Sequence, residues 1–289
     1  MLGKLIKHEW KGTYKTGCLF LIALLSVTFL SWLAFQSPMW RSLAEENAYE
    51  SGLFSLLDIA SVFTLFFYAI MLAVVSVGIM VYLAVHFYKT MYTDEGYLTH
   101  TLPVSTNQLM VSKILISGIW VMIVMIAVFL SLFALINFLV GAATPEGYSL
   151  IEIWSMFFDE FGDVLVKLFR EELGINPVVY LVFFILNILV SPFASMAIIF
   201  GAISMGQLFT KHRVLMAIVS YFGLIIINGI LASVTEGIIS AVHINVDSAE
   251  MFGRYMNINL SASSILSIVM AVAMYLVSYL VNTKKLNME

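Results

Sequence analysis

The chain has 289 residues, of which 61% are hydrophobic and 11% are charged, whereas soluble domains contain roughly half apolar and a quarter charged residues. Together with a mean hydropathy of +0.99, this composition excludes a soluble globular domain and indicates an integral membrane protein. The single cysteine, Cys18, lies in an apolar stretch, so a disulfide framework and a thiolate metal site are both excluded. The formal net charge is −4, but the placement of the charges is more informative than their sum.

Residues 1–16 have the pattern of a basic amphipathic helix. Its apolar side consists of Leu2, Leu5, Ile6, Trp10 and Tyr14. Its opposite side consists of Lys4, Lys7, Lys11, Lys15 and His8. Such a helix is expected to lie in the membrane interface, with its lysines toward anionic headgroups. A signal-peptide n-region is the alternative, and it fits less well because no small-residue cleavage pattern ends the long apolar stretch that follows.

Six stretches are apolar and long enough to cross a bilayer, which requires about 20 residues. They lie at about 17–36, 57–87, 105–140, 177–208, 214–234 and 260–281. The second and third exceed the required length, so we expect them to tilt or to extend into water. Pro192, inside the fourth, predicts a kink. The predicted fold class is an all-α membrane protein with one transmembrane domain over residues 1–289.

The basic residues are distributed unequally between the two sides of the membrane. An even number of spans places both termini on one side, and that side carries ten of the 14 Lys and Arg residues. They are Lys4, Lys7, Lys11, Lys15, Lys89, Lys113, Lys211, Arg213, Lys284 and Lys285. The other side carries Arg41, Lys167, Arg170 and Arg254. The positive-inside rule therefore predicts cytoplasmic termini, and the expected location is a bacterial cell membrane, crossed several times.

A charged amphipathic stretch separates the third and fourth spans. Residues 149–173 place Leu150, Trp154, Phe157, Phe158, Phe161, Leu165 and Leu168 on one helical face. The opposite face carries Glu152, Asp159, Glu160, Asp163, Lys167 and Arg170. These charges exclude a span and predict a helix on the outer surface with its apolar face down, ending near Gly174. Packing on the ends of the spans and a part in handling a substrate are both open roles for it.

The stretch from Phe87 to Lys113 is a polar segment between the second and third spans. Thr93 is a potential N-cap for a short helix that has acidic residues in its first turn, and Pro103 predicts the end of that helix. Ser105 and Gln108 have capping-box spacing at the start of the third span, with Val104 and Leu109 placed as a hydrophobic staple. A loop that only connects two spans is the alternative interpretation of this segment.

The residue order of this segment resembles a loop of a known family. Asp-Glu-Gly-Tyr-Leu (94–98) is followed by Thr-Leu-Pro-Val (101–104) and then Ser-Lys (112–113). This order resembles the loop between the second and third spans of ABC type 2 permeases, the membrane subunits of bacterial ABC exporters, which carries their coupling helix. The resemblance is strong in this loop, and it extends to the rest of the chain only as a pattern of spans.

The resemblance implies a mechanism and a set of site residues. It implies a coupling helix at 92–102, an N-terminal elbow helix at 1–16, a separate ATPase subunit that holds ATP and Mg²⁺, and a second permease that is either a copy of this chain or a sister. The residues that would dock the ATPase are Tyr92, Asp94, Glu95, Gly96, Tyr97 and Leu98. Gly96 would permit close approach of the backbone.

Motifs of catalysis and nucleotide binding are absent from the sequence. No P-loop, H-E-x-x-H, C-x-x-C or G-x-S-x-G motif occurs, so we expect no enzyme activity, cofactor or metal in this chain, and no nucleic-acid partner. His86 directly precedes the polar segment and His100 lies within it, and the two lack ligand spacing. Ionisable residues are nearly missing from the spans; Asp58 and Glu236 lie near the outer ends, which argues against an ion-coupled transporter.

Two functions remain open from the sequence. The first is an exporter permease for an amphiphilic or lipid-like substrate, such as an antimicrobial peptide, as the resemblance implies. The second is a membrane protein that does not transport: a scaffold, a sensor partner or an immunity protein. A neighbouring gene for an ATPase with a P-loop and no spans would favour the first.

Overall fold

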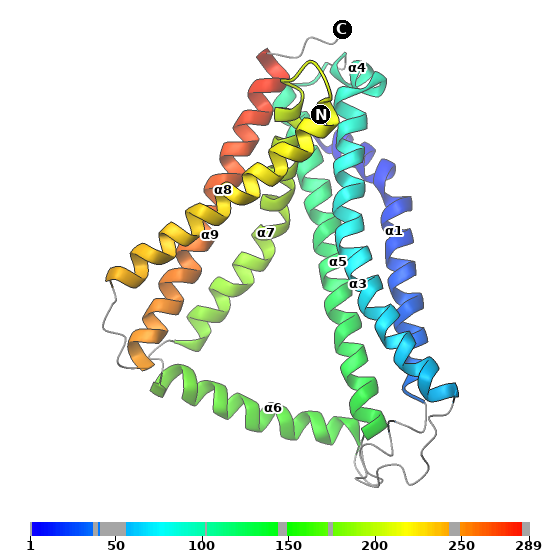
Figure 1. Ribbon diagram of the computed structural model, residues 1–289, viewed down its shortest axis with the longest axis vertical. Helices are drawn as coiled ribbons and strands as arrows, with labels where there is room; N and C mark the ends of the chain where they lie inside the picture. The colour runs from blue at the N-terminus through cyan, green and yellow to red at the C-terminus, as the bar shows by residue number, and fades with distance from the viewer. Residues whose placement is uncertain are drawn as a thin grey trace. The chain divides into compact units, whose positions relative to one another are not determined.

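A computed structural model describes residues 2–36, 40, 56–101, 103–143, 149–172, 176–242 and 249–284. These residues form helices and no strand (Figure 1). The helices are α1 (Leu2–Ala34), α3 (Leu56–Tyr92), α4 (Asp94–His100), α5 (Thr106–Ala143), α6 (Leu150–Lys167), the π-helix η1 (Leu168–Glu172), α7 (Pro177–Gly206), α8 (Arg213–Val242) and α9 (Ala249–Lys284). Six of them, α1, α3, α5, α7, α8 and α9, are long and apolar enough to cross a membrane. The protein is thus a multi-pass all-α membrane protein, and its six long helices match the six predicted spans.

Helix α1 differs from the two elements predicted over the same residues. The sequence predicted an interfacial helix to Thr16 and a separate span from Gly17, whereas α1 is continuous through both. Gly17 does not interrupt it but permits close packing, since a Cβ there would lie 2.5 Å from the ring of Trp120. The side chains of Trp10 and Tyr14, predicted on the apolar face, are exposed, and Glu9 and Thr13 are buried instead.

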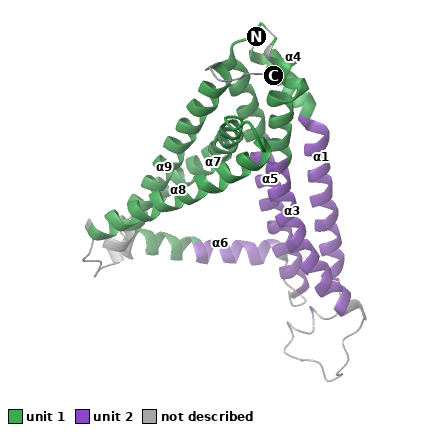
Figure 2. Cartoon of the chain, turned by 45° about the horizontal axis from the view of Figure 1, so that its top comes forward, with its two compact units in different colours: residues 1–12, 82–119, 162–289 green, residues 13–81, 120–161 purple. Residues whose placement is uncertain are grey.

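The contacts within the chain group the residues into two compact units (Figure 2). Unit 1 comprises residues 1–12, 82–119 and 162–289, and unit 2 comprises residues 13–81 and 120–161. Each long helix of the N-terminal half therefore contributes one part to each unit, whereas α7, α8 and α9 belong wholly to unit 1. The sequence predicted a single transmembrane domain, and it gave no sign of a division part-way along α1, α3 and α5.

Unit 1 contains the closely packed helices α7, α8 and α9. Their packing depends on small residues: a Cβ added at Gly201 would lie 2.6 Å from Met274, and one at Gly206 would lie 2.6 Å from the backbone nitrogen of Ala217. Ala202, Leu224 and Met274 form a buried apolar cluster between the three helices. Pro192, predicted to cause a kink, lies buried inside α7.

Unit 2 holds parts of α1, α3 and α5 together through buried hydroxyl groups. The Oγ of Ser131 lies 2.6 Å from the Oγ1 of Thr28 and 2.7 Å from the hydroxyl of Tyr68, so one residue of α5 joins α1 and α3. The indole N–H of Trp120 donates to the Oγ1 of Thr13. In an apolar medium such bonds hold helices together where burial of apolar surface cannot.

Helix α6 occupies most of the predicted amphipathic stretch. It begins with a reciprocal capping box, in which the backbone N–H of Ser149 donates to the carboxylate of Glu152 and the N–H of Glu152 donates to the hydroxyl of Ser149. Within unit 2, the indole N–H of Trp154 donates to the Oδ1 of Asn137 over 2.7 Å, and its ring packs on Phe133. The π-helix η1 continues the element, and Gly174, the predicted end, lies outside the described residues.

Candidate functional site

The short helix α4 lies between the end of α3 and the start of α5, inside unit 1. Thr93 occupies the predicted N-cap position with extended backbone angles (φ −109°, ψ −167°), but its side chain makes no capping hydrogen bond. The hydroxyl donates backwards to the carbonyl of Lys89 over 2.6 Å. The helix ends at His100, where the N–H of Thr101 donates to the carbonyl of Tyr97, and Pro103 follows. The segment predicted as a coupling helix, 92–102, thus contains a helix of seven residues, and its coupling role stays a prediction.

Gly96 lies in the first turn of α4, next to the end of α3. A Cβ at this position would lie 2.5 Å from the carbonyl carbon and oxygen of Met91, a separation that side chains do not tolerate. The N–H of Gly96 donates to the carbonyl of Thr93 over 2.7 Å. The sequence predicted that Gly96 permits close backbone approach to a partner; the structure places the close approach within this chain, against the last turn of α3.

Three of the predicted docking residues are exposed on α4. Asp94 and Glu95 occupy the first turn, where carboxylates favourably meet the positive end of a helix. The side chain of Tyr97 is 61% exposed, so a large aromatic ring extends from a helix that also carries two acids. The side chain of Leu98 lies outside the described residues. The exposed surface of α4, meaning Asp94, Glu95 and Tyr97, is therefore acidic with one aromatic ring.

Tyr92, also predicted to dock a partner, points into unit 1. Its hydroxyl lies 2.7 Å from the Oγ of Ser204 on α7 and accepts from the Nδ2 of Asn282 on α9 over 2.9 Å. The hydroxyls of Ser204 and Ser278 lie 2.5 Å apart and complete the network. The last residue of α3 before the α4 turn is thus bonded to both α7 and α9.

A buried cluster of charged groups lies in the same unit. The ammonium of Lys113 on α5 donates to the Oε1 of Glu9 on α1 over 2.6 Å and to the Oγ1 of Thr90 on α3 over 2.7 Å. The Nε2 of His86 lies 3.4 Å from the other oxygen of the same carboxylate. Lys113 and Glu9 are both buried. The cluster joins the N-terminal turns of α1 to the two helices that flank α4.

Of the two hydrogen bonds of the capping box predicted at the start of α5, the structure contains one. The Oγ of Ser105 accepts from the backbone N–H of Gln108 over 3.4 Å, and the carbonyl of Ser105 accepts from the N–H of Leu109. The helix therefore begins where the sequence placed the third span. Lys113 therefore lies about two turns after the start of α5, on the buried face of this helix.

The burial of Glu9 and Lys113 was not predicted from the sequence, which placed Lys113 only among the basic residues on the side of the chain termini. A signal for Lys113 exists in the pattern of α5, because Leu109, Lys113, Ile116 and Trp120 follow one another at spacings of three and four residues, and all four are buried. A lysine within an apolar stripe needs an anionic partner. No such stripe pointed to Glu9, because that glutamate lies among basic residues.

The polar contacts around α4 hold the ends of the neighbouring helices together. Within the described part of the chain, no group of three or more His, Cys, Asp and Glu side chains could hold a metal ion. The two polar networks connect α1, α3, α5, α7 and α9 on either side of α4.

Comparisons with protein-family models, with curated proteins and with solved structures each found no match for the chain.

Proposed function

We propose that this chain is the membrane-spanning permease subunit of an ABC exporter in a bacterial cell membrane, with both termini in the cytoplasm. A separate ATPase subunit would hold ATP and Mg²⁺ and would dock on α4, and a second permease would complete the transporter. The substrate would be amphiphilic or lipid-like, as the resemblance of the 94–113 segment to ABC type 2 permeases implies.

The observation that carries the proposal is the way α4 is built. It is a separate short helix between two long apolar helices, with Asp94, Glu95 and Tyr97 exposed and with Gly96 packed on the backbone of Met91. A helix that passes movement from an ATPase to the spans must expose a surface to the ATPase. It must also be connected firmly to the spans. The surface of α4 meets the first requirement, and the networks around Tyr92 and Lys113 meet the second.

We propose fewer residues in direct contact with the ATPase than the six that the sequence predicted. Asp94, Glu95 and Tyr97 are the groups that a partner can contact, and Leu98 stays a prediction. Tyr92 and Gly96 act on docking through the position of α4, because one is bonded to α7 and α9 and the other packs on α3. Substitutions at these two groups of positions should therefore have different consequences.

The test is extraction of the native complex in a mild detergent, followed by identification of its subunits by mass spectrometry. We expect a nucleotide-binding subunit to copurify with the wild-type chain. Tyr97→Ala should lower its retention, because loss of an aromatic anchor costs about 2 kcal/mol or more, which is roughly 30-fold in binding. Phe209→Ala is the matched control, since Phe209 is 45% exposed in the turn between α7 and α8, at the end of α7.

Two results would contradict the proposal. One is a native complex that contains no nucleotide-binding subunit, which would favour a scaffold, a sensor partner or an immunity protein. The other is equal retention of that subunit by Tyr97→Ala, Phe209→Ala and the wild-type chain, which would remove α4 as the docking surface. Size-exclusion profiles of the variants show that each is folded before retention is compared.

A further inference from the structure

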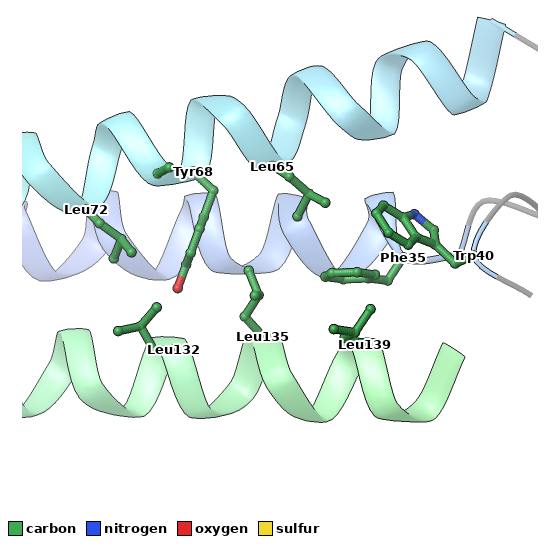
Figure 3. Close-up of a pocket in the computed structure, with 9 residues that line it drawn as sticks. Phe35, Trp40, Leu65, Tyr68, Leu72, Leu132, Leu135 and Leu139 are labelled. Carbon is green, nitrogen blue, oxygen red and sulfur yellow. The ribbon is translucent and has the colours of Figure 1, made fainter. Parts of the chain in front are cut away.

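Unit 2 contains an apolar pocket between α1, α3 and α5 (Figure 3). The pocket has a volume of about 360 Å³, within the range of about 300–1,000 Å³ typical of small-molecule sites. Phe35 and Trp40 lie at one end; Leu65 and Leu72 line it from α3, and Leu135 lines it from α5. The only polar atom of these side chains is the indole nitrogen of Trp40. Its N–H already donates to the carbonyl of Ala34.

The one hydroxyl group among the lining residues is also satisfied. Tyr68 lines the pocket, and its hydroxyl lies 2.7 Å from the Oγ of Ser131, which in turn lies 2.6 Å from the Oγ1 of Thr28. The three bonds that these hydroxyls make with Leu24 and with one another account for all three hydroxyl hydrogens, so none is left to donate to a headgroup or to a row of water molecules. A water molecule in such a space would lack the two to four polar partners that hold buried water in place. The occupant should therefore be apolar along its whole length.

The pocket runs along the helices and has the length of part of a lipid chain. Leu65 and Leu72 are seven residues apart on α3, which corresponds to about 10 Å along the helix axis. That length is about a third of the hydrocarbon core of a bilayer, which is roughly 30 Å thick. Trp40 lies beyond the end of α1, and tryptophan is enriched at the level of the headgroups. The pocket thus extends from one membrane interface toward the centre of the bilayer.

The wall formed by α5 is open to the surrounding medium. The side chains of Leu132 and Leu139, which line the pocket on this helix, are 40% and 41% exposed. In a multi-pass membrane protein the medium around exposed leucines is lipid, so acyl chains are present at high concentration beside the opening. The occupant therefore needs no passage through water.

We propose that this pocket binds one acyl chain of a phospholipid from the leaflet that faces away from the chain termini. Phe35, Leu65, Leu72 and Leu135 surround the chain, and Trp40 covers its headgroup end. The headgroup stays in the interface and makes no specific contact in the pocket. This lipid site belongs to unit 2 alone and does not depend on an ATPase or on the proposed export function.

The experiment uses the full-length protein in nanodiscs that contain a phosphatidylethanolamine with a diazirine on one acyl chain. The sample is mixed with an excess of unlabelled vesicles, so that the labelled lipid exchanges. Aliquots are irradiated at increasing times after mixing, and the labelled peptides are identified by mass spectrometry. Lipid on the outer face of α3 should exchange first, so adducts at Phe63 and Phe66, which are 68% and 66% exposed, should disappear early. Adducts at the lining residues Phe35, Trp40, Leu65, Leu72 and Leu135 should persist about tenfold longer.

Two variants connect the slow adducts to the pocket. Leu135→Trp fills the space from α5, and its matched control Leu130→Trp places the same ring on an exposed position of the same helix. We expect Leu135→Trp to lower the persistent adducts about tenfold, the factor for ~1.4 kcal/mol, and Leu130→Trp to leave them unchanged. Ala69→Leu, a smaller change in the pocket lining, takes the place of Leu135→Trp if that variant does not fold.

The proposal is overturned if adducts in the pocket disappear as fast as those at Phe63 and Phe66. It is equally overturned if the filled-pocket variant and Leu130→Trp retain the persistent adducts to the same extent, because the lipid would then be bound elsewhere. Neither result bears on whether an ATPase docks on α4, which is tested by copurification.

Discussion

The ammonium of Lys113 lies 2.6 Å from the carboxylate of Glu9, although the two residues are 104 positions apart and belong to different helices. Both are buried. The hydroxyl of Thr90 and the ring of His86 occupy further positions around the pair. Charge buried in this way is tolerated only when it is paired and hydrogen-bonded, so the pair fixes the first turns of α1 against α3 and α5.

Breaking this ion pair from one side should destabilise the protein more than removing both charges. Lys113→Met removes the ammonium that pairs with the buried carboxylate of Glu9, and such losses cost about 3–5 kcal/mol. The double variant Lys113→Met/Glu9→Gln should lose less than the sum of the single variants, as a cycle of unfolding measurements in detergent would show. Lys89→Met, at an exposed position on α3, is the control. Strictly additive losses would mean that the two groups do not interact energetically.

Removing the hydroxyl of Tyr92 should loosen the junction of α3 with α7 and α9. Tyr92→Phe keeps the ring but removes one hydrogen bond from Ser204 and one from Asn282, although both keep their bonds to Ser278. Loss of the two bonds should together cost about 1–3 kcal/mol. The free energy of unfolding, measured in detergent with a denaturant, should fall by roughly that amount. Tyr88→Phe is the matched control on the same helix, because the hydroxyl of Tyr88 makes no hydrogen bond with a described residue. Equal losses in the two variants would show that the network contributes nothing.

The six spans and the short helix α4 could be predicted because each depends on local pattern. Apolar length identifies a span regardless of its neighbours, and a proline three residues after His100 limits a helix wherever the segment lies. The capping residues Ser105 and Thr93 were placed correctly as starting positions for the same reason, although the side chain of Thr93 bonds to Lys89 instead of capping.

Contacts between distant helices could not be predicted in the same way. In the sequence, Tyr92 has the pattern of a surface aromatic residue next to an acidic turn. Its side chain points inward because it bonds to Ser204 and Asn282, which are more than 100 residues away in the chain. Glu9 follows His8 in a basic segment, and its burial depends on Lys113. Helical periodicity indicates which face of a helix is apolar, but it does not indicate which polar groups two helices bring together.

Replacing Gly96 should damage the turn between α3 and α4 before it affects any partner. In Gly96→Ala the new Cβ would lie 2.5 Å from the backbone of Met91, so α4 must shift. We expect faster proteolysis at 93–101 and a lower melting temperature. Gly223→Ala is the control, since nothing lies within 4 Å of a Cβ there, and the better helix propensity of alanine should stabilise α8 by up to ~1 kcal/mol. A Gly96→Ala variant as resistant as wild type would show that the turn adapts freely.

The start of α6 should depend on pH through Glu152. The backbone N–H and then the hydroxyl of Ser149 stabilise the carboxylate form and hold the pKa of Glu152 below its ordinary value of 4.5. Because the pKa is lowered on folding, the contribution to stability is present above pH 4.5 and is lost as the pH falls through the lowered pKa. NMR titration of the ¹³C-labelled carboxyl group measures this pKa directly. Ser149→Ala removes only the hydroxyl and should return the pKa part of the way; no change in that variant would contradict a side-chain contribution.

The distribution of Lys and Arg predicts which side of the membrane each exposed segment faces. Asp94 on α4 and Asp159 on α6 are both exposed, and the positive-inside rule places them on opposite sides, with α4 in the cytoplasm. Cysteines are introduced singly in a Cys18→Ala background, because Cys18 is itself exposed. An impermeant maleimide added to intact cells should label Asp159→Cys, and it should label Asp94→Cys only after the membrane is opened. Labelling of Asp94→Cys from outside would reverse the orientation, and no cytoplasmic ATPase could then dock on α4.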